Sequence, residues 1–132
     1  MANYIALIHK DADSDYGVSF PDFPGCITAG RTVDEARDLA MEALAFHIAG
    51  MAEDGETPPE PSTLEAVMAE RENRDAVAIL VPAPAGAIKA VRVNISLPED
   101  LLRQIDAHAE RTGMTRSGYI ARAARRAFED AA

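Results

Sequence analysis

The residues with the clearest capacity for chemistry lie between Val91 and Leu97, in the string VRVNISL. Apolar and polar side chains alternate there, which is typical of a β-strand because successive side chains point to opposite faces. We therefore expect a strand with one polar face, and two such faces side by side would form a ribbon that fits a DNA major groove. The apolar positions are Val91, Val93, Ile95 and Leu97, and the polar ones are Arg92, Asn94 and Ser96.

Two helices are predicted to follow this strand and to position its polar face. Pro98 suits the first turn of a helix, and Glu99 and Asp100 place negative charge at its positive end. Gly113 would end that helix as a C′ residue, and Thr115 would cap the next one. The apolar stripes predicted to be buried are Leu101, Leu102, Ile105, His108 and Ala109 in the first helix and Tyr119, Ile120, Ala123, Ala124, Ala127 and Phe128 in the second.

One strand and two short helices cannot close a core alone, because a single strand leaves both of its edges unpaired. A second copy would supply the missing strand, and the two strands would pair antiparallel over interleaved helices. Residues 91–128 resemble the ribbon-helix-helix DNA-binding domain over the whole of that segment. The alternative is an ordinary edge strand beside an exposed helical hairpin.

The ribbon-helix-helix resemblance implies two sets of DNA-contacting residues. The polar face of the strand would contact base edges, and the amide end of the second helix would hold a backbone phosphate. These sets are Arg92, Asn94 and Ser96 on the strand, and Thr115, Arg116 and Ser117 at the start of the helix.

The first 83 residues are predicted to form a separate α+β sandwich in the order β-β-β-α-(α)-β. Capping boxes at Thr32–Glu35 and Ser62–Glu65 open a long amphipathic helix and a short one. The short helix is expected to point Leu64, Val67 and Met68 inward. The predicted inner face of the long helix is Ala36, Leu39, Ala40, Ala43, Leu44, His47, Ile48 and Met51, and the predicted strands span residues 3–10, 16–20, 26–30 and 76–82. A small-residue linker, 84–90, then separates this domain from a second domain at 91–132.

Residues 16–44, YGVSFPDFPGCITAGRTVDEARDLAMEAL, resemble the signature of the HicB antitoxin family. The resemblance rests on a Gly-aromatic strand, an F-P-D-x-P-G-C loop and a G-x-T-x-x-E-A helix start at fixed spacing. Arg31 departs from the acidic residue common at that position, a surface difference. The resemblance implies a partial RNase-H-like fold and a partner toxin of the HicA type, which is a small, basic, mRNA-cleaving ribonuclease.

In that family the first domain covers the RNA-facing surface of the toxin. We expect contacts from the 20–26 loop and from acidic side chains on the long helix, although the apolar loop residues have self-packing as an equal alternative. The expected toxin-contacting residues are Phe20, Asp22, Phe23, Pro24, Asp34, Asp38 and Glu42.

The net charge of −9 is unevenly divided along the chain. Residues 1–89 carry 6 Lys and Arg against 16 Asp and Glu, a net charge of −10, whereas residues 90–132 carry 7 against 6, a net charge of +1. An acidic first part suggests a basic partner, and a nearly neutral second part implies that DNA binding needs dimers or tetramers. No signal peptide and no apolar run near the ~20 residues of a membrane span is found, so we expect a cytoplasmic protein with no membrane partner.

Catalytic and metal sites are not expected. Nuclease chemistry needs carboxylates converging on two metal ions, and residues 4–9 of the first strand contain none. His9, His47 and His108 are too scattered for a metal site, and Cys26 is the only cysteine, predicted to be a packed residue. No cofactor is expected.

The sequence thus predicts an antitoxin that neutralises a HicA-type toxin and represses its own operon by binding operator DNA as a dimer, with tetramers formed through the first domain. The alternative is a ribbon-helix-helix transcription regulator whose first domain senses a small ligand or a metal. A third interpretation is a degenerate nuclease that retains metal-dependent activity.

Overall fold

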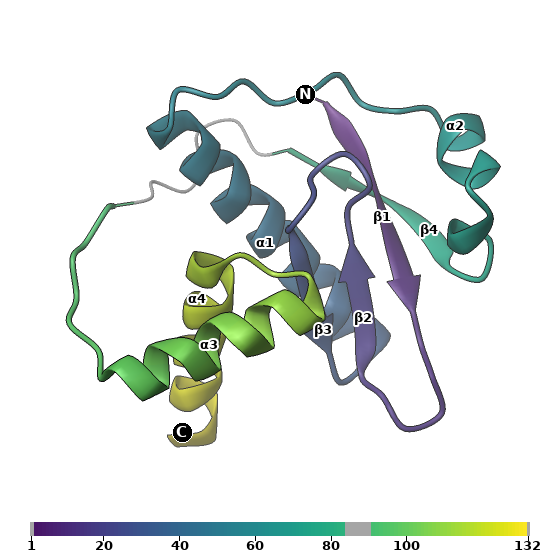
Figure 1. Cartoon of the computed structure of the whole chain (residues 1–132). Coiled ribbons are helices and arrows are strands. Elements are labelled where there is room, and N and C mark those ends of the chain that lie inside the picture. Colours follow the sequence, from purple (N-terminus) through teal and green to yellow (C-terminus); the bar gives the residue numbers. More distant parts are fainter. Residues whose placement is uncertain (1, 84–90, 132) are drawn as a thin grey trace.

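The computed structural model describes residues 2–83 and 91–131, so the predicted linker at 84–90 lies outside the described residues (Figure 1). The first domain contains a four-stranded antiparallel sheet in the order β3-β2-β1-β4. Its strands are β1 (Asn3–His9), β2 (Tyr16–Ser19), β3 (Ile27–Gly30) and β4 (Val77–Pro82). The predicted order of strands and helices in this domain is confirmed.

Strand β1 is central because its apolar run can be buried on both faces. Its five residues from Tyr4 to Ile8 are all buried. Alternate residues belong to different clusters, Tyr4, Ala6 and Ile8 to one and Ile5 and Leu7 to the other. The sheet therefore has a packed layer on each side.

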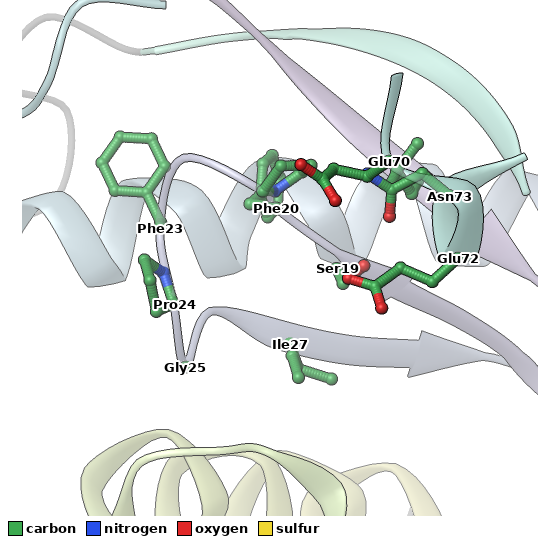
Figure 2. A pocket seen from close by; sticks show the side chains of 11 residues that line it. Ser19, Phe20, Phe23, Pro24, Gly25, Ile27, Glu70, Glu72 and Asn73 are labelled. Carbon is green, nitrogen blue, oxygen red and sulfur yellow. The ribbon is translucent and has the colours of Figure 1, made fainter. Parts of the chain in front are cut away.

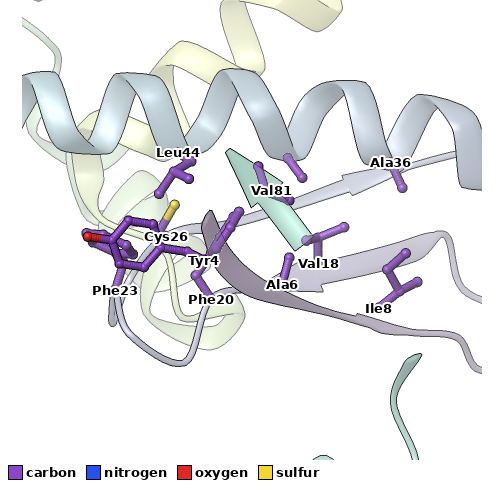
Figure 3. Packing of buried hydrophobic residues seen from close by; sticks show 11 residues of the cluster. Tyr4, Ala6, Ile8, Val18, Phe20, Phe23, Cys26, Ala36, Leu44 and Val81 are labelled. Atoms are coloured by element: carbon purple, nitrogen blue, oxygen red, sulfur yellow. The ribbon is translucent and has the colours of Figure 1, made fainter. Parts of the chain in front are cut away.

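Helix α1 (Val33–Glu53) covers one face of the sheet (Figure 3). Its capping box forms almost as predicted: Thr32 Oγ1 accepts a hydrogen bond from the backbone N–H of Glu35 at 3.0 Å. The Glu35 carboxylate accepts from the N–H of Arg31 at 3.2 Å, one residue earlier than expected. The helix residues buried against the sheet are Ala36, Ala40, Leu44 and Ala45.

The other face carries helix α2 (Leu64–Ala69) and the 3-10 turn η1 (Arg71–Asn73). Val67 packs on Ile5 and Leu7, with Met68 at the edge of that cluster, as predicted. Leu64 does not point inward as predicted but is 51% exposed, because this six-residue helix reaches the sheet only at its Val67 turn. The N-cap is Thr63, whose Oγ1 accepts from the N–H of Ala66.

The second domain contains helices α3 (Glu99–Thr112) and α4 (Arg116–Ala131). Gly113 ends α3 in the left-handed conformation with φ of 73°, which confirms its predicted role. The strand predicted at 91–97 is not present in the single chain, since a strand requires a hydrogen-bonded partner and none is available there. Val93 is 70% exposed and Ile95 61% exposed, so the predicted apolar face is uncovered.

Several residues that their spacing placed on buried stripes are exposed in the single chain, so their burial is not confirmed. They are Leu101, His108, Ala123, Ala124, Ala127 and Phe128. Of these, Phe128 is 74% exposed. Of the α3 stripe only Ala109 is fully buried. Both stripes were predicted to pack against a second copy, and one chain by itself offers them little to pack on.

Candidate interaction surfaces

The predicted base-contacting residues lie in the segment that leads into α3. Arg92, Asn94 and Ser96 are all exposed. The guanidinium of Arg92 is not free, because its Nη2 lies 2.6 Å from Oδ1 of Asp54 at the end of α1. An exposed ion pair of this kind contributes about 0.2–1 kcal/mol, so Arg92 can exchange it for another partner at small cost.

The predicted phosphate-holding residues lie at the start of α4. Thr115, Arg116 and Ser117 are exposed, and Thr115 Oγ1 accepts a hydrogen bond from the N–H of Gly118 at 3.0 Å. Arg116 donates two hydrogen bonds of 2.8 Å to Asp106 on α3, and the bond from this guanidinium lowers the pKa of the Asp106 carboxyl. Within the described residues, no hydrogen bond or ion pair joins this set to the base-contacting set.

The turn between α3 and α4 rests on the first domain. A Cβ placed on Gly113 would lie 2.7 Å from Cδ1 of Ile27, and one on Gly25 would lie 3.1 Å from Cγ2 of Thr115. Two ion pairs extend this contact along α4. Arg125 lies 3.5 Å from Glu42 on α1, and Arg126 lies 3.2 Å from Asp15 before β2.

The aromatic residues of the 20–26 loop pack on their own domain. Phe20 and Phe23 are 3% and 2% exposed, and their rings meet edge to face at 6.4 Å. Phe23 also meets the ring of Tyr4 at 4.7 Å. The self-packing alternative therefore describes these two residues. Of the apolar loop residues expected to contact the toxin, Pro24 is the one that is exposed.

Asp22 has a structural role that the sequence did not reveal. Its Oδ2 accepts a hydrogen bond from the N–H of Ser62 at 2.9 Å, and its Oδ1 accepts one from the Ser62 hydroxyl at 2.5 Å. The carboxylate thus ties the 20–26 loop to the segment before α2. Ser62, predicted to open a capping box, has its side chain in this tether instead.

The predicted acidic contacts on α1 lie on the exposed side of that helix. Asp34 and Asp38 are exposed, and no ion pair of theirs is seen within the described ranges. Glu42 differs from them, since Arg125 of α4 already neutralises it at 3.5 Å. The structure does not bring these acids into one site with the 20–26 loop. That loop buries Phe20 and Phe23 against the inner side of α1, whereas the acids are exposed on its outer side.

A hollow of about 370 Å³ lies on the sheet face opposite α1, between the 20–26 loop and η1 (Figure 2). Its floor is mainly apolar, whereas Glu70 and Glu72 extend their carboxylates over it from η1. These two acids were not predicted from the sequence, although the charged string ERE after a short helix was a visible signal. The lining residues are Leu7, Ser19, Phe20, Pro21, Phe23, Pro24, Gly25, Ile27, Glu70, Glu72 and Asn73.

Cys26 lies in the core beside Phe23, where burial raises the pKa of its thiol to about 12. The thiol is therefore neutral at pH 7, and a neutral thiol is a poor nucleophile. Over residues 2–83 and 91–131, no three His, Cys, Asp or Glu side chains gather in a way that suits a metal ion. Over the same residues, no helix combines the length and apolarity that a membrane span requires.

Comparison with known proteins adds a family to this geometry. A family model described as a HicB-like antitoxin of bacterial toxin-antitoxin systems matches residues 4–124. The crystal structure of the antitoxin HicB of Burkholderia pseudomallei is 38% identical, covers 94% of this chain and 96% of its own, and superposes with a TM-score of 0.61. The crystal structure of antitoxin HicB3 is 27% identical with coverages of 93% and 95% and a TM-score of 0.54.

A phage protein is also similar in sequence. It comes from Haemophilus phage HP1, is described as an uncharacterized 14.9 kDa protein in the rep-hol intergenic region, and is 41% identical over 105 residues, which are 78% of each chain. The matches to the family model and to the full-length crystal structures extend over both the sheet domain and the helical hairpin.

Proposed function

Because this chain belongs to the HicB-like antitoxin family of bacterial toxin–antitoxin systems, we propose that it neutralises a HicA-type, mRNA-cleaving toxin by covering its active surface. The observation that carries this proposal is the likeness to a HicB antitoxin along 94% of the chain. The acidity of the first domain supports it, since a net charge of −10 over residues 1–89 would attract a basic toxin and repel competing RNA. The antitoxin itself is proposed to have no enzymatic activity.

The test is co-purification of this chain with the small basic protein encoded beside it, followed by an RNA-cleavage assay on that protein. We expect a stable complex and loss of cleavage when the antitoxin is added in equimolar amount. Cleavage that continues at saturating antitoxin would refute neutralisation, and RNA cleavage by this chain alone would favour a degenerate nuclease.

The second part of the proposal is repression of the chain's own operon by residues 91–132 acting as a ribbon-helix-helix dimer. Two copies would pair their 91–97 segments, bury Val93 and Ile95 between them, and present Arg92, Asn94 and Ser96 to the major groove. The exposure of both the apolar and the polar residues in the single chain is compatible with this use. Tetramers through the first domain would place two ribbons on paired half-sites.

The operator-binding proposal is tested with Arg92→Ala and Asn94→Ala in a gel-shift titration on the chain's own promoter. We expect each to abolish sequence-specific binding, because a good bidentate base contact contributes about 1–3 kcal/mol and both copies lose it. Arg103→Ala is the matched control, since Arg103 is an exposed arginine on α3 that pairs with Glu99. Equal operator affinity in all three variants would refute the assignment of the ribbon.

A further inference from the structure

We propose that the hollow under Glu70 and Glu72 holds a cationic side chain, preferably an arginine, from the surface of the toxin. This inference rests on the proposed function and deepens it, because it names the site on the first domain and the chemistry that fills it. The hollow of about 370 Å³ lies on the face of the sheet that α1 leaves free (Figures 2 and 3).

The chemistry of the hollow has two parts that match the two parts of an arginine side chain. Pro21, Pro24 and Ile27 offer accessible apolar surface in the lining. The carboxylates of Glu70 and Glu72 extend over the hollow from the start of η1 (Figure 2). An arginine buries its aliphatic stem on apolar surface while its guanidinium stays at a polar boundary. Two carboxylates can accept its planar set of donors in a bidentate manner, which an ammonium group cannot match.

The carboxylates over the hollow have no cationic partner among the described residues. No arginine of the nearby helical hairpin forms an ion pair with Glu70 or Glu72, and three of them pair with other acids. Arg116 pairs with Asp106, Arg125 with Glu42 and Arg126 with Asp15. The hollow is thus an acidic site that this part of the chain leaves for a partner to neutralise.

The walls of the hollow are held in place by contacts that do not involve the two acids. The Asn73 side chain donates a hydrogen bond of 2.8 Å to the Val67 carbonyl and so fixes η1 against α2. Asp22 ties the loop on the opposite wall to Ser62. A partner side chain would therefore enter a site that is already formed, which reduces the ordering cost of binding.

The acids of the turn between β1 and β2 offer a charged surface outside the hollow. Asp11 and Asp13 are exposed in that turn, and no ion pair of theirs is seen among the described residues. They carry the same formal charge as the Glu70–Glu72 pair but line no part of the hollow. This makes them a matched control for charge without site geometry.

The experiment measures the affinity of the full-length antitoxin for the purified toxin encoded beside it, by titration calorimetry at physiological salt. The test variant is Glu70→Gln with Glu72→Gln, and the control is Asp11→Asn with Asp13→Asn. We expect the test variant to raise Kd by about tenfold or more, because it leaves a desolvated guanidinium without its carboxylates. The control should raise Kd by less than about threefold, as expected for exposed charges that only steer encounter.

Equal weakening by both pairs would overturn the inference, because total charge alone would then explain binding. An unchanged Kd in the Glu70–Glu72 variant would overturn it as well. If the wild-type antitoxin does not bind the toxin, the proposed function is refuted, and so is this inference, which rests on it. That outcome differs from the two outcomes above, in which the wild type binds and only the variants decide. Melting temperatures of all variants check the fold, which should persist because the four acids are exposed.

Discussion

At the scale of single residues, Asp22 shows how a side chain suited to recognition can be used for structure. The two hydrogen bonds from Ser62 to its carboxylate join segments 40 positions apart. They hold the 20–26 loop, on which both the hollow and the α3–α4 turn depend.

Asp22→Ala should lower the free energy of unfolding by about 1–3 kcal/mol, since it leaves the Ser62 N–H and hydroxyl without their acceptor. Ser62→Ala should cost about half as much, because the bond from the backbone N–H remains. Urea denaturation of both single variants and the double variant measures these values. If the two losses simply add in the double variant, the tether does not exist as described.

His47 lies half-buried on α1 with its ring 5.8 Å from that of Phe23. Burial lowers the pKa of His47, and the charge of Glu56 opposes this only in part. The folded chain therefore binds a proton less readily than the unfolded chain, whose histidine has the ordinary value of 6.5. The free energy of unfolding should fall as the pH drops through 6.5, where the unfolded chain takes up its proton first.

The measurement is urea unfolding of the wild type and His47→Gln between about pH 7.5 and about pH 5, a window that spans the ordinary histidine pKa. We expect the substitution to flatten the pH dependence of the free energy of unfolding in this window. The same pH dependence of the free energy of unfolding in His47→Gln and the wild type would contradict the role given to His47.

Residue roles were predictable where the partner is near in the sequence. Thr32 caps α1 and Gly113 ends α3 as predicted, because each acts on backbone groups within about four positions. For α2 the cap is Thr63, one residue after the predicted Ser62. The tether from Asp22 to Ser62 depends on where the fold places the two loops, and no local pattern contains that information. The same reason hid Glu70 and Glu72, which meet the 20–26 loop only after folding.

At the scale of elements, the junction between β3 and α1 is a very tight contact in the first domain. A Cβ on Gly30 would lie 2.4 Å from the backbone nitrogen of Ala36, and backbone atoms cannot move aside as a flexible side chain can. Gly50, inside α1, has nothing within 4 Å of the position that a Cβ would take. Alanine at these two positions should therefore have opposite effects on the free energy of unfolding.

Gly30→Ala should destabilise the protein by about 1–3 kcal/mol or more, because β3 and α1 must separate to admit the methyl group. Gly50→Ala should stabilise it by about 0.5–1 kcal/mol, since alanine is the better residue inside a helix. Thermal unfolding of the two variants distinguishes the signs. A stable Gly30→Ala variant would mean that α1 does not start as close to β3 as described.

The elements of the first domain were predictable in type and order because each has its own hydrophobic period. The 91–97 segment shows the limit of that method. Its alternating pattern is that of a strand, but a strand exists only with a neighbour, and the described residues of one chain supply none. The pattern thus reports a capacity for pairing, and the single chain leaves Val91, Val93 and Ile95 more than 60% exposed.

At the scale of the whole molecule, this uncovered apolar surface should drive self-association. Lysines in place of Val93 and Ile95 should convert the dimer to monomer at micromolar concentration, because burial of each apolar side chain contributes about 1.5–3 kcal/mol. Analytical ultracentrifugation measures the change. Lysines in place of Val33 and Met41, which are 50% and 40% exposed on α1, form the control and should leave the dimer intact. Equal behaviour of the two variants would place the dimer contact elsewhere.

The charge count predicts the contrast between an acidic first part of the chain and a nearly neutral second part. It does not predict how the sheet and the helical hairpin meet. Arg125–Glu42 and Arg126–Asp15 join residues 83 and 111 positions apart, and the ion pairs use side chains that look like ordinary solvated surface in the sequence.

The close contact between Gly113 and Ile27 has an evolutionary consequence. Asn is the residue that best replaces glycine at a left-handed helix end, but its Cβ would meet Cδ1 of Ile27 at 2.7 Å. A lineage that acquires Asn at position 113 must therefore turn the end of the Ile27 side chain aside or shorten that side chain to Val or Ala. Among relatives that keep both domains, we expect these two positions to covary despite their distance along the sequence.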